Sequence, residues 1–167
     1  SIGGQEVGTV WGHGAYVAPD WSADWLHREA VYILNALAME KDSTSYDKLT
    51  PERQAYMKAL LQKDLRTNRY NDASKTIVVS DFRAKAIKSN ADYYMSLFTD
   101  GKEQAKERFA YAIPENTIKS NESMQKMNAF FFWAAWACVT ERPGHDITYT
   151  SNWPGDDLVG NHPTGKH

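Results

Sequence analysis

Residues 121–144 read NESMQKMNAFFFWAAWACVTERPG and contain the longest apolar run of the chain, 129–139. Asn121 can cap the start of a helix, and Pro143-Gly144 would end it. One face of this predicted helix carries apolar side chains at helical spacing: Met124, Met127, Phe131, Ala134, Ala135 and Cys138. Aromatic residues cover much of the remaining surface: Phe130, Phe132, Trp133 and Trp136. A helix that is apolar nearly all round is central to a core or meets a second apolar surface.

Apolar spacing predicts four further helices, at about 21–41, 51–69, 81–99 and 102–111. Capping residues precede the three longer ones: Asp20 or Ser22, Thr50 before Pro51, and Ser80 or Asp81. A turn at 71–74 and a short β-branched strand at 76–79 lie between the second and third helices. The ends of the chain are rich in Gly and Pro. The sequence therefore predicts a mainly α fold in a single domain, 1–167, with irregular N- and C-terminal segments.

Composition excludes several classes of protein. The net charge is −2 and no basic stripe is present, so we expect no nucleic-acid partner. The single cysteine, Cys138, lies in an apolar stretch and is expected to be a buried, inert thiol. Without a C-x-x-C-H motif, the chain cannot attach a c-type haem covalently. Its longest apolar run is far shorter than the roughly 20 residues of a membrane span.

No catalytic constellation is evident in the sequence. The five histidines are scattered without H-x-x-x-H spacing, and no nucleophile elbow, Walker loop or G-x-G-x-x-G is present. The dipole of the helix start explains Asp20 and Asp24, which lie one turn apart. His13 is flanked by Gly12 and Gly14, which would suit a tight turn or a close approach to a ligand or another surface. We therefore predict no catalytic and no cofactor-binding residue.

The aromatic residues leave two interpretations open. The cluster Phe130-Phe131-Phe132-Trp133 with Trp136 is most simply a core, but it could also pack against a membrane-embedded partner. Four other tryptophans lie near the ends of the chain, where interfacial anchors of a membrane-attached domain would be placed: Trp11, Trp21, Trp25 and Trp153. A free-standing helical protein that binds or senses a small molecule in an aromatic pocket is the alternative.

Three segments resemble a known family. They are WGHGAYVAPDWSADWLHRE at 11–29, FFFWAAWACVTERPG at 130–144, and YTSNWP at 149–154 followed by LVGNHPT at 158–164. Together they resemble the extracytoplasmic domain of the single-chain, quinol-dependent nitric oxide reductases, the region between the first two transmembrane helices. The first segment is long and unusual, and the middle of the chain, about 42–120, is less diagnostic.

The resemblance implies a cytochrome c-like helical fold that carries no haem. It also implies a parent oxidoreductase on the periplasmic face of the bacterial cytoplasmic membrane. That parent reduces two NO to N2O and water with electrons from quinol, using haem b, haem b3 and non-haem iron held by its membrane helices. None of those ligands is in this sequence, so the chain would be non-catalytic and would cover and stabilise the membrane domain of the same protein.

The resemblance also implies binding residues. Gly14-Ala15-Tyr16 matches a segment whose backbone oxygens bind a calcium ion in related enzymes, so Gly14 and Tyr16 are predicted calcium ligands in the full-length protein, with little or no binding by this chain alone. The predicted interface with the membrane domain comprises Trp11, His13, Tyr16, Trp21, Trp25 and Trp153. We expect Trp11, Tyr16 or Trp153 to be more exposed than core aromatics. We also expect the N-terminal stretch and the Trp153 tail to lie side by side.

Overall fold

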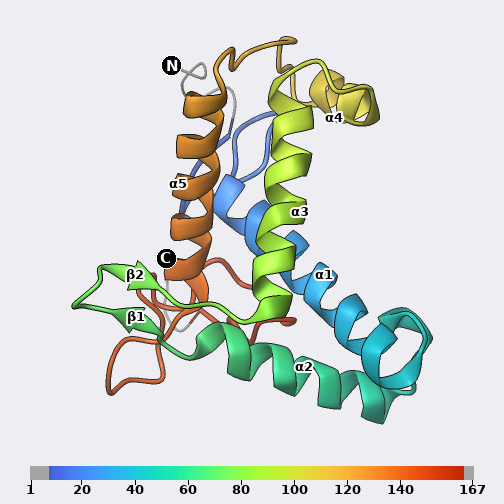
Figure 1. The fold of residues 1–167 in the computed structure, drawn as a ribbon, viewed down its shortest axis with the longest axis vertical. Helices are drawn as coiled ribbons and strands as arrows, with labels where there is room; N and C mark the ends of the chain where they lie inside the picture. Colours follow the sequence, from blue (N-terminus) through green and yellow to red (C-terminus); the bar gives the residue numbers. More distant parts are fainter. Residues whose placement is uncertain (1–7, 164–167) are drawn as a thin grey trace.

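The computed structural model describes residues 8–163 and consists mainly of helices (Figure 1). The α-helices are α1 (Trp21–Asp42), α2 (Pro51–Arg66), α3 (Asp81–Phe98), α4 (Ala105–Ala110) and α5 (Asn121–Val139). Two 3-10 turns, η2 (Tyr46–Lys48) and η3 (Lys102–Gln104), precede α2 and α4. A small antiparallel hairpin, β1 (Tyr70–Asn71) and β2 (Thr76–Ile77), projects beside α5. The prediction of a mainly α single domain is confirmed.

Side chains that precede the long helices fix where those helices begin. Asp20, Thr50 and Ser80 each accept a hydrogen bond from a backbone N–H in the first turn of α1, α2 and α3, as predicted. The prediction that Asn121 caps α5 is wrong by one residue. Ser120 is extended, and its hydroxyl accepts from the Ser123 N–H at 3.1 Å, so Asn121 is already helical.

Two helices end earlier than predicted because the chain pairs elsewhere. α2 stops at Arg66, and the carbonyl of Arg69 then accepts a hydrogen bond from the Val78 N–H at the hairpin. α5 stops at Val139, and the Glu141 N–H donates to the Arg66 carbonyl at 3.0 Å. These tertiary hydrogen bonds compete with another turn of helix, which apolar spacing alone does not reveal.

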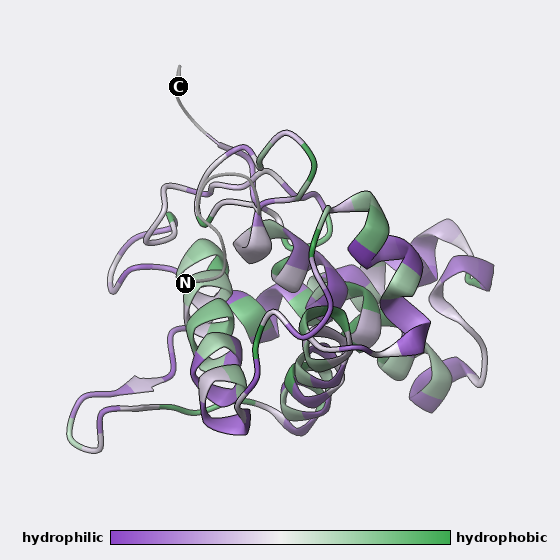
Figure 2. Ribbon diagram, turned by 90° about the horizontal axis from the view of Figure 1, so that it is seen from above, coloured by the Kyte–Doolittle hydropathy of each residue, from purple (hydrophilic) through white to green (hydrophobic). Residues whose placement is uncertain are grey.

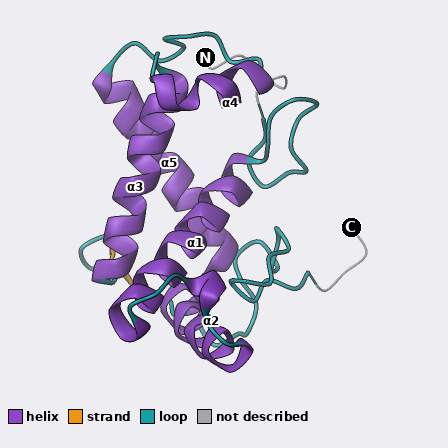
Figure 3. Ribbon diagram, turned by 90° about the vertical axis from the view of Figure 1, so that its right-hand side faces the viewer, coloured by secondary structure: helices purple, strands orange, loops and turns teal. Residues whose placement is uncertain are grey.

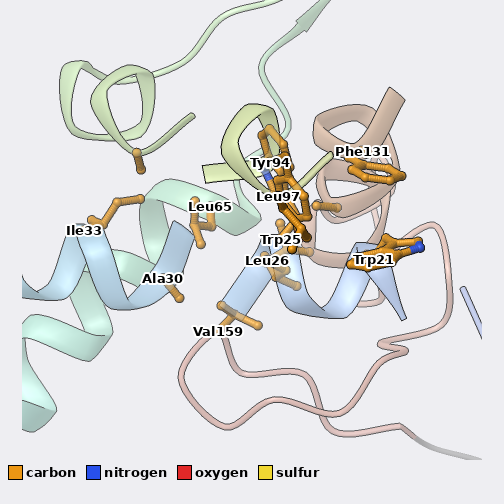
Figure 4. Close-up of a cluster of buried hydrophobic side chains, with 14 of the residues drawn as sticks. Trp21, Trp25, Leu26, Ala30, Ile33, Leu65, Tyr94, Leu97, Phe131 and Val159 are labelled. Atoms are coloured by element: carbon orange, nitrogen blue, oxygen red, sulfur yellow. The ribbon is translucent and has the colours of Figure 1, made fainter. Parts of the chain in front are cut away.

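The core forms where α1 packs against α3, α5 and α2. In Figure 1, α3 and α5 stand side by side, α1 crosses behind them and α2 runs across their base. Figure 4 shows aromatic rings of α1, α3 and α5 meeting at this crossing. Trp25 stacks on Tyr94 at a ring separation of 5.3 Å, and Trp21 stacks on Phe131 at 5.9 Å. Burial of such rings is the largest source of stability available to this fold.

Trp21 and Trp25 are therefore core residues and not surface anchors. Only 2% of Trp21 and 0% of Trp25 is exposed, because both lie on the side of α1 that faces α3 and α5. The expectation that they contribute to a contact surface with another domain is not met. Their sequence position near the irregular N-terminal segment is a poor guide, since α1 begins at Trp21 itself.

An ion pair lies inside the core between α1 and α3. The Arg83 Nε donates to the Glu29 carboxylate at 2.5 Å, and both side chains are excluded from solvent. Burial raises the pKa of Glu29, while the neighbouring Arg83 and the Trp25 indole act in the opposite direction. Glu29 Oε2 and Arg83 Nη2 have no hydrogen-bond partner, so the pair is only partly satisfied.

α5 has both a core face and an exposed aromatic face. Its residues are mostly hydrophobic in Figure 2, and they are not confined to the side toward the other helices. Phe131 and Cys138 are buried, and burial raises the pKa of the Cys138 thiol to about 12, as expected for an inert thiol. Phe130 and Trp133 are exposed. Among the helices at 8–163, none is long and apolar enough to cross a membrane.

Candidate functional site

Asp20 organises the N-terminal loop that precedes α1. One of its carboxylate oxygens accepts the Gly12 N–H at 2.6 Å and the Thr9 hydroxyl at 2.8 Å. The other accepts the Ala23 N–H at 3.0 Å and the Ser22 hydroxyl. The same carboxylate therefore caps the helix and folds the loop back on it. Hydrogen bonds to a carboxylate are stronger than neutral ones, so this loop is held in one conformation.

The loop ends in a tight turn that presents Tyr16 to solvent. Gly14 has a positive φ of 84°, which glycine adopts without strain, and its N–H donates to the Thr9 hydroxyl at 2.9 Å. The Ala15 N–H donates to the Ala18 carbonyl at 2.8 Å and closes the turn. Tyr16, between these residues, is fully exposed. Tyr16 and the partly exposed Trp11 therefore both present aromatic rings to solvent from this one loop.

Trp11 fixes this loop to α5. Its indole N–H donates to the Ala134 carbonyl at 3.0 Å, and its ring lies 5.3 Å from that of Trp133. Even so, 40% of the Trp11 side chain remains exposed. The expectation that Trp11 and Tyr16 are more exposed than core aromatics is confirmed, and Trp153 is half-buried.

The C-terminal tail lies directly against the N-terminal loop. The Trp153 indole N–H donates to the Gly12 carbonyl at 3.2 Å, and the Trp153 and His13 rings are 4.7 Å apart. Figure 3 shows the loops of both ends on the same side of the helices. A further contact joins the His27 imidazole to the Asp156 carboxylate at 3.0 Å. The prediction that the two segments lie side by side is confirmed, and we call residues 11–17 with residues 148–156 the terminal patch.

Arg66, at the end of α2, holds the tail in place. Its guanidinium donates to Glu141, Asn152 and Asn161 side chains and to the carbonyls of Asp146, Val159 and Gly160. Asn161 is itself buried and donates to the Cys138 and Pro154 carbonyls. Sequence reasoning missed Arg66, because its partners lie 75–95 residues downstream and no local pattern connects them.

The described residues do not form a cluster of side chains that could bind a metal ion. Within 8–163, no group of three or more His, Cys, Asp or Glu side chains could hold a metal ion. His13 packs on Trp153, His27 pairs with Asp156, and His162 lies 3.4 Å from Asp157 on the surface. The two predicted calcium ligands, Gly14 and Tyr16, would contribute backbone oxygens only, so side chains at this turn cannot test that prediction.

The residues do not fit a covalently bound haem. The only cysteine, Cys138, is buried within α5 and its backbone carbonyl already accepts from Asn161. The centre of the helical core is filled by the large rings of Trp21, Trp25, Tyr94 and Phe131. A porphyrin in that space would have to displace several of these side chains.

A groove runs along the exposed aromatic face of α5. It encloses about 900 Å³ and is lined by residues from the N-terminal loop, the β1–β2 hairpin, α5 and the tail. A second depression, between α1 and α3, encloses about 780 Å³ and includes Arg28, Asn35 and Tyr93. Both are open grooves, whereas a free-standing protein with an aromatic binding pocket would hold its ligand in a closed, deep cavity.

Comparison with known proteins agrees with the geometry. A search of curated proteins finds no significant match. The family of the NorB cytochrome c-like domain, from nitric oxide reductase, matches residues 1–155, which is nearly the whole chain. The mainly helical, single-domain architecture is consistent with that description. The chain therefore belongs to the family of cytochrome c-like domains found in the NorB subunit of nitric oxide reductase.

Proposed function

We propose that this chain is the haem-free domain of a single-chain, quinol-dependent nitric oxide reductase. In this role it lies over the membrane part of the same protein on the periplasmic side. It covers and stabilises the helices that hold haem b, haem b3 and non-haem iron, and it catalyses no reaction itself. The parent enzyme reduces two NO to N2O and water with electrons from quinol.

The terminal patch is the observation that carries this proposal. Tyr16 is fully exposed although Asp20 and the Gly14 turn hold its loop rigidly. Trp153 and His13 join that loop to the tail, so both ends of the chain contribute to one surface. Aromatic residues are enriched in protein interfaces, because they supply a large contact area with only two rotatable side-chain bonds.

The absence of a motif for haem attachment supports a parent reductase of the quinol-dependent type. A domain that passed electrons from a soluble donor to the membrane centre would need its own redox group. This chain lacks C-x-x-C-H, and aromatic rings fill its core. Electrons would therefore enter the parent enzyme without crossing this domain, as they do when quinol is oxidised within the membrane part.

A calcium ion at the terminal patch fits the same arrangement. Calcium accepts backbone carbonyl oxygens as ligands, and Gly14 and Tyr16 lie in the tight turn at the tip of the patch. The remaining ligands would come from the membrane part. The ion would then join the two parts, and the isolated chain would bind calcium weakly or not at all.

Photo-crosslinking in the full-length reductase tests the position of the domain. Replacing Tyr16 by a photoreactive benzoyl-phenylalanine is expected to give crosslinks to peptides of the membrane part, because this side chain would contact it. Phe109 on α4 is the matched control, since it is a surface aromatic with 90% exposure that does not belong to the terminal patch. The same replacement at Phe109 is expected to give no such crosslink.

A second variant tests whether the rigid loop matters. Asp20→Asn removes the charge that holds Gly12 and Thr9, so the loop becomes mobile and the yield of crosslinks from position 16 falls. Equal crosslinking from positions 16 and 109, or crosslinking from 109 alone, would contradict the proposed orientation.

A further inference from the structure

Aromatic side chains line much of the groove on α5; Trp136 among them is buried, and the others are exposed or partly buried. Its walls come from four separate parts of the chain: Trp11, the hairpin residues Tyr70 and Ile77, the α5 residues Phe132, Trp133 and Trp136, and Tyr149. Trp133 remains 46% exposed although it packs on Trp11 and Phe130. The groove has a volume of about 900 Å³ and is open to solvent rather than enclosed.

The charges of the groove favour an amphipathic ligand with an anionic group. Lys75, at the turn of the hairpin, is the cation of the lining, and no carboxylate is among the residues that line it. Lys75 pairs with Asp72, and both side chains are well exposed. Little free energy is therefore lost when Lys75 exchanges Asp72 for another anionic group. Thr76 and Thr150 add hydroxyl groups at the same site. The groove thus combines a largely apolar, aromatic lining with a single positively charged side chain.

The groove continues the terminal patch. Trp11 belongs to both, since it fixes the N-terminal loop to α5 and also lines the groove. Tyr149 and Thr150 of the tail line its other side. Tryptophan and tyrosine are the residues that membrane proteins place at the boundary between headgroups and acyl chains. The groove therefore lies beside the surface that we propose to face the membrane part.

We propose that this groove binds a membrane phospholipid, with an acyl chain along the aromatic floor and the phosphate beside Lys75. The inference rests on the proposed function, because it requires the domain to lie at a bilayer. Binding would come from apolar contact, since a net charge of −2 gives the chain no overall attraction to anionic membranes. Lipid in the groove would anchor the face of α5 that is exposed in the chain alone.

Vesicles of phosphatidylcholine with brominated acyl chains test the proposal on the 167-residue chain, which has its own core. Bromine on the acyl chain is expected to quench the fluorescence of Trp133 and Trp11, and the chain is expected to float with the vesicles. Trp133→Ser is expected to weaken binding about tenfold, because the largest exposed ring of the floor is lost. Phe109→Ser removes a ring that lies outside the groove and is more exposed than Trp133, 90% against 46%, and should leave binding unchanged.

The position of the phosphate is tested separately. Lys75→Glu is expected to weaken binding to the phosphatidylcholine vesicles about fivefold, because a carboxylate replaces the ammonium group that would pair with the lipid phosphate. Raising the salt concentration should change binding of the unaltered chain little, since apolar contact dominates.

Other outcomes would overturn the lipid proposal. If Trp133→Ser and Phe109→Ser weakened vesicle binding equally, the contact between the chain and the vesicles would not be specific to the groove. Self-association of the chain that Trp133→Ser abolishes, without vesicle binding, would assign the groove to a second copy. Failure of lipid binding together with crosslinking from Tyr16 would reject the lipid and keep the proposed function. Failure of both would reject the membrane-facing orientation as well.

Discussion

Arg66→Ala is expected to lower the free energy of unfolding by about 3 kcal/mol and to release the C-terminal tail. The Arg66 side chain is only 14% exposed and holds the tail through Glu141, Asn152, Asn161 and several carbonyls. Removing it leaves those acceptors and the Glu141 charge without their donor. Because the tail carries Trp153, the terminal patch should open at the same time.

Urea unfolding gives the loss of stability, and hydrogen exchange of residues 141–161 reports release of the tail. Arg53→Ala is the matched control, since Arg53 also makes a two-bond ion pair, with Asp42, but is 41% exposed. Arg53→Ala should lower the free energy of unfolding by less than about 1 kcal/mol. If Arg66→Ala cost no more than Arg53→Ala and left exchange in the tail unchanged, Arg66 would not be what holds the tail.

Arg83→Met is expected to lower the free energy of unfolding by roughly 3–5 kcal/mol at neutral pH, because it leaves the Glu29 charge buried without a partner. Arg83 normally lowers the pKa of Glu29, whereas burial raises it. Without Arg83, the pKa of folded Glu29 rises further above the unfolded value. The folded state then binds a proton that the unfolded state releases, so stability falls as pH rises above about 4.5.

The pH dependence distinguishes this effect from a simple loss of packing. Arg83→Met should gain stability when the pH is lowered from 7 toward 5, relative to the unaltered chain. The double variant Glu29→Gln with Arg83→Met removes the titrating group, so it should lose this extra dependence and recover part of the stability. Thermal or urea unfolding across that pH range measures both. A pH profile of Arg83→Met that parallels the double variant would contradict a buried, charged Glu29.

The helices can be predicted because their signals are local. Asp20, Thr50 and Ser80 can be recognised as helix caps, because a short polar side chain directly before a segment with helical apolar spacing commonly caps the helix. The ends of α2 and α5 cannot be predicted with the same accuracy. They are decided by the Arg69–Val78 and Glu141–Arg66 backbone hydrogen bonds, which tertiary packing brings about. A tertiary contact that ends a helix does not change the spacing of apolar residues along the sequence, so such an end cannot be predicted from that spacing.

The candidate site can be predicted in part. The family resemblance of the N-terminal stretch and the tail implies that the two lie side by side, and contact between Gly12 and Trp153 confirms that they do. Trp21 and Trp25 are misplaced by sequence reasoning because a tryptophan in a helical segment can face either way, and only the crossing of α1 with α3 and α5 decides. The α5 groove forms only where the β1–β2 hairpin and the N-terminal loop meet beside that helix. No single segment of the sequence predicts this meeting.

Hydrogen exchange in the full-length reductase, compared with the 167-residue chain alone, tests most directly whether this domain covers a membrane part. The amides of residues 9–18 and 148–156 are expected to exchange more slowly in the full-length protein, while those of α4 exchange at the same rate in both. Unchanged rates across the terminal patch, together with new protection at α4, would show that the domain faces its membrane part through a different surface.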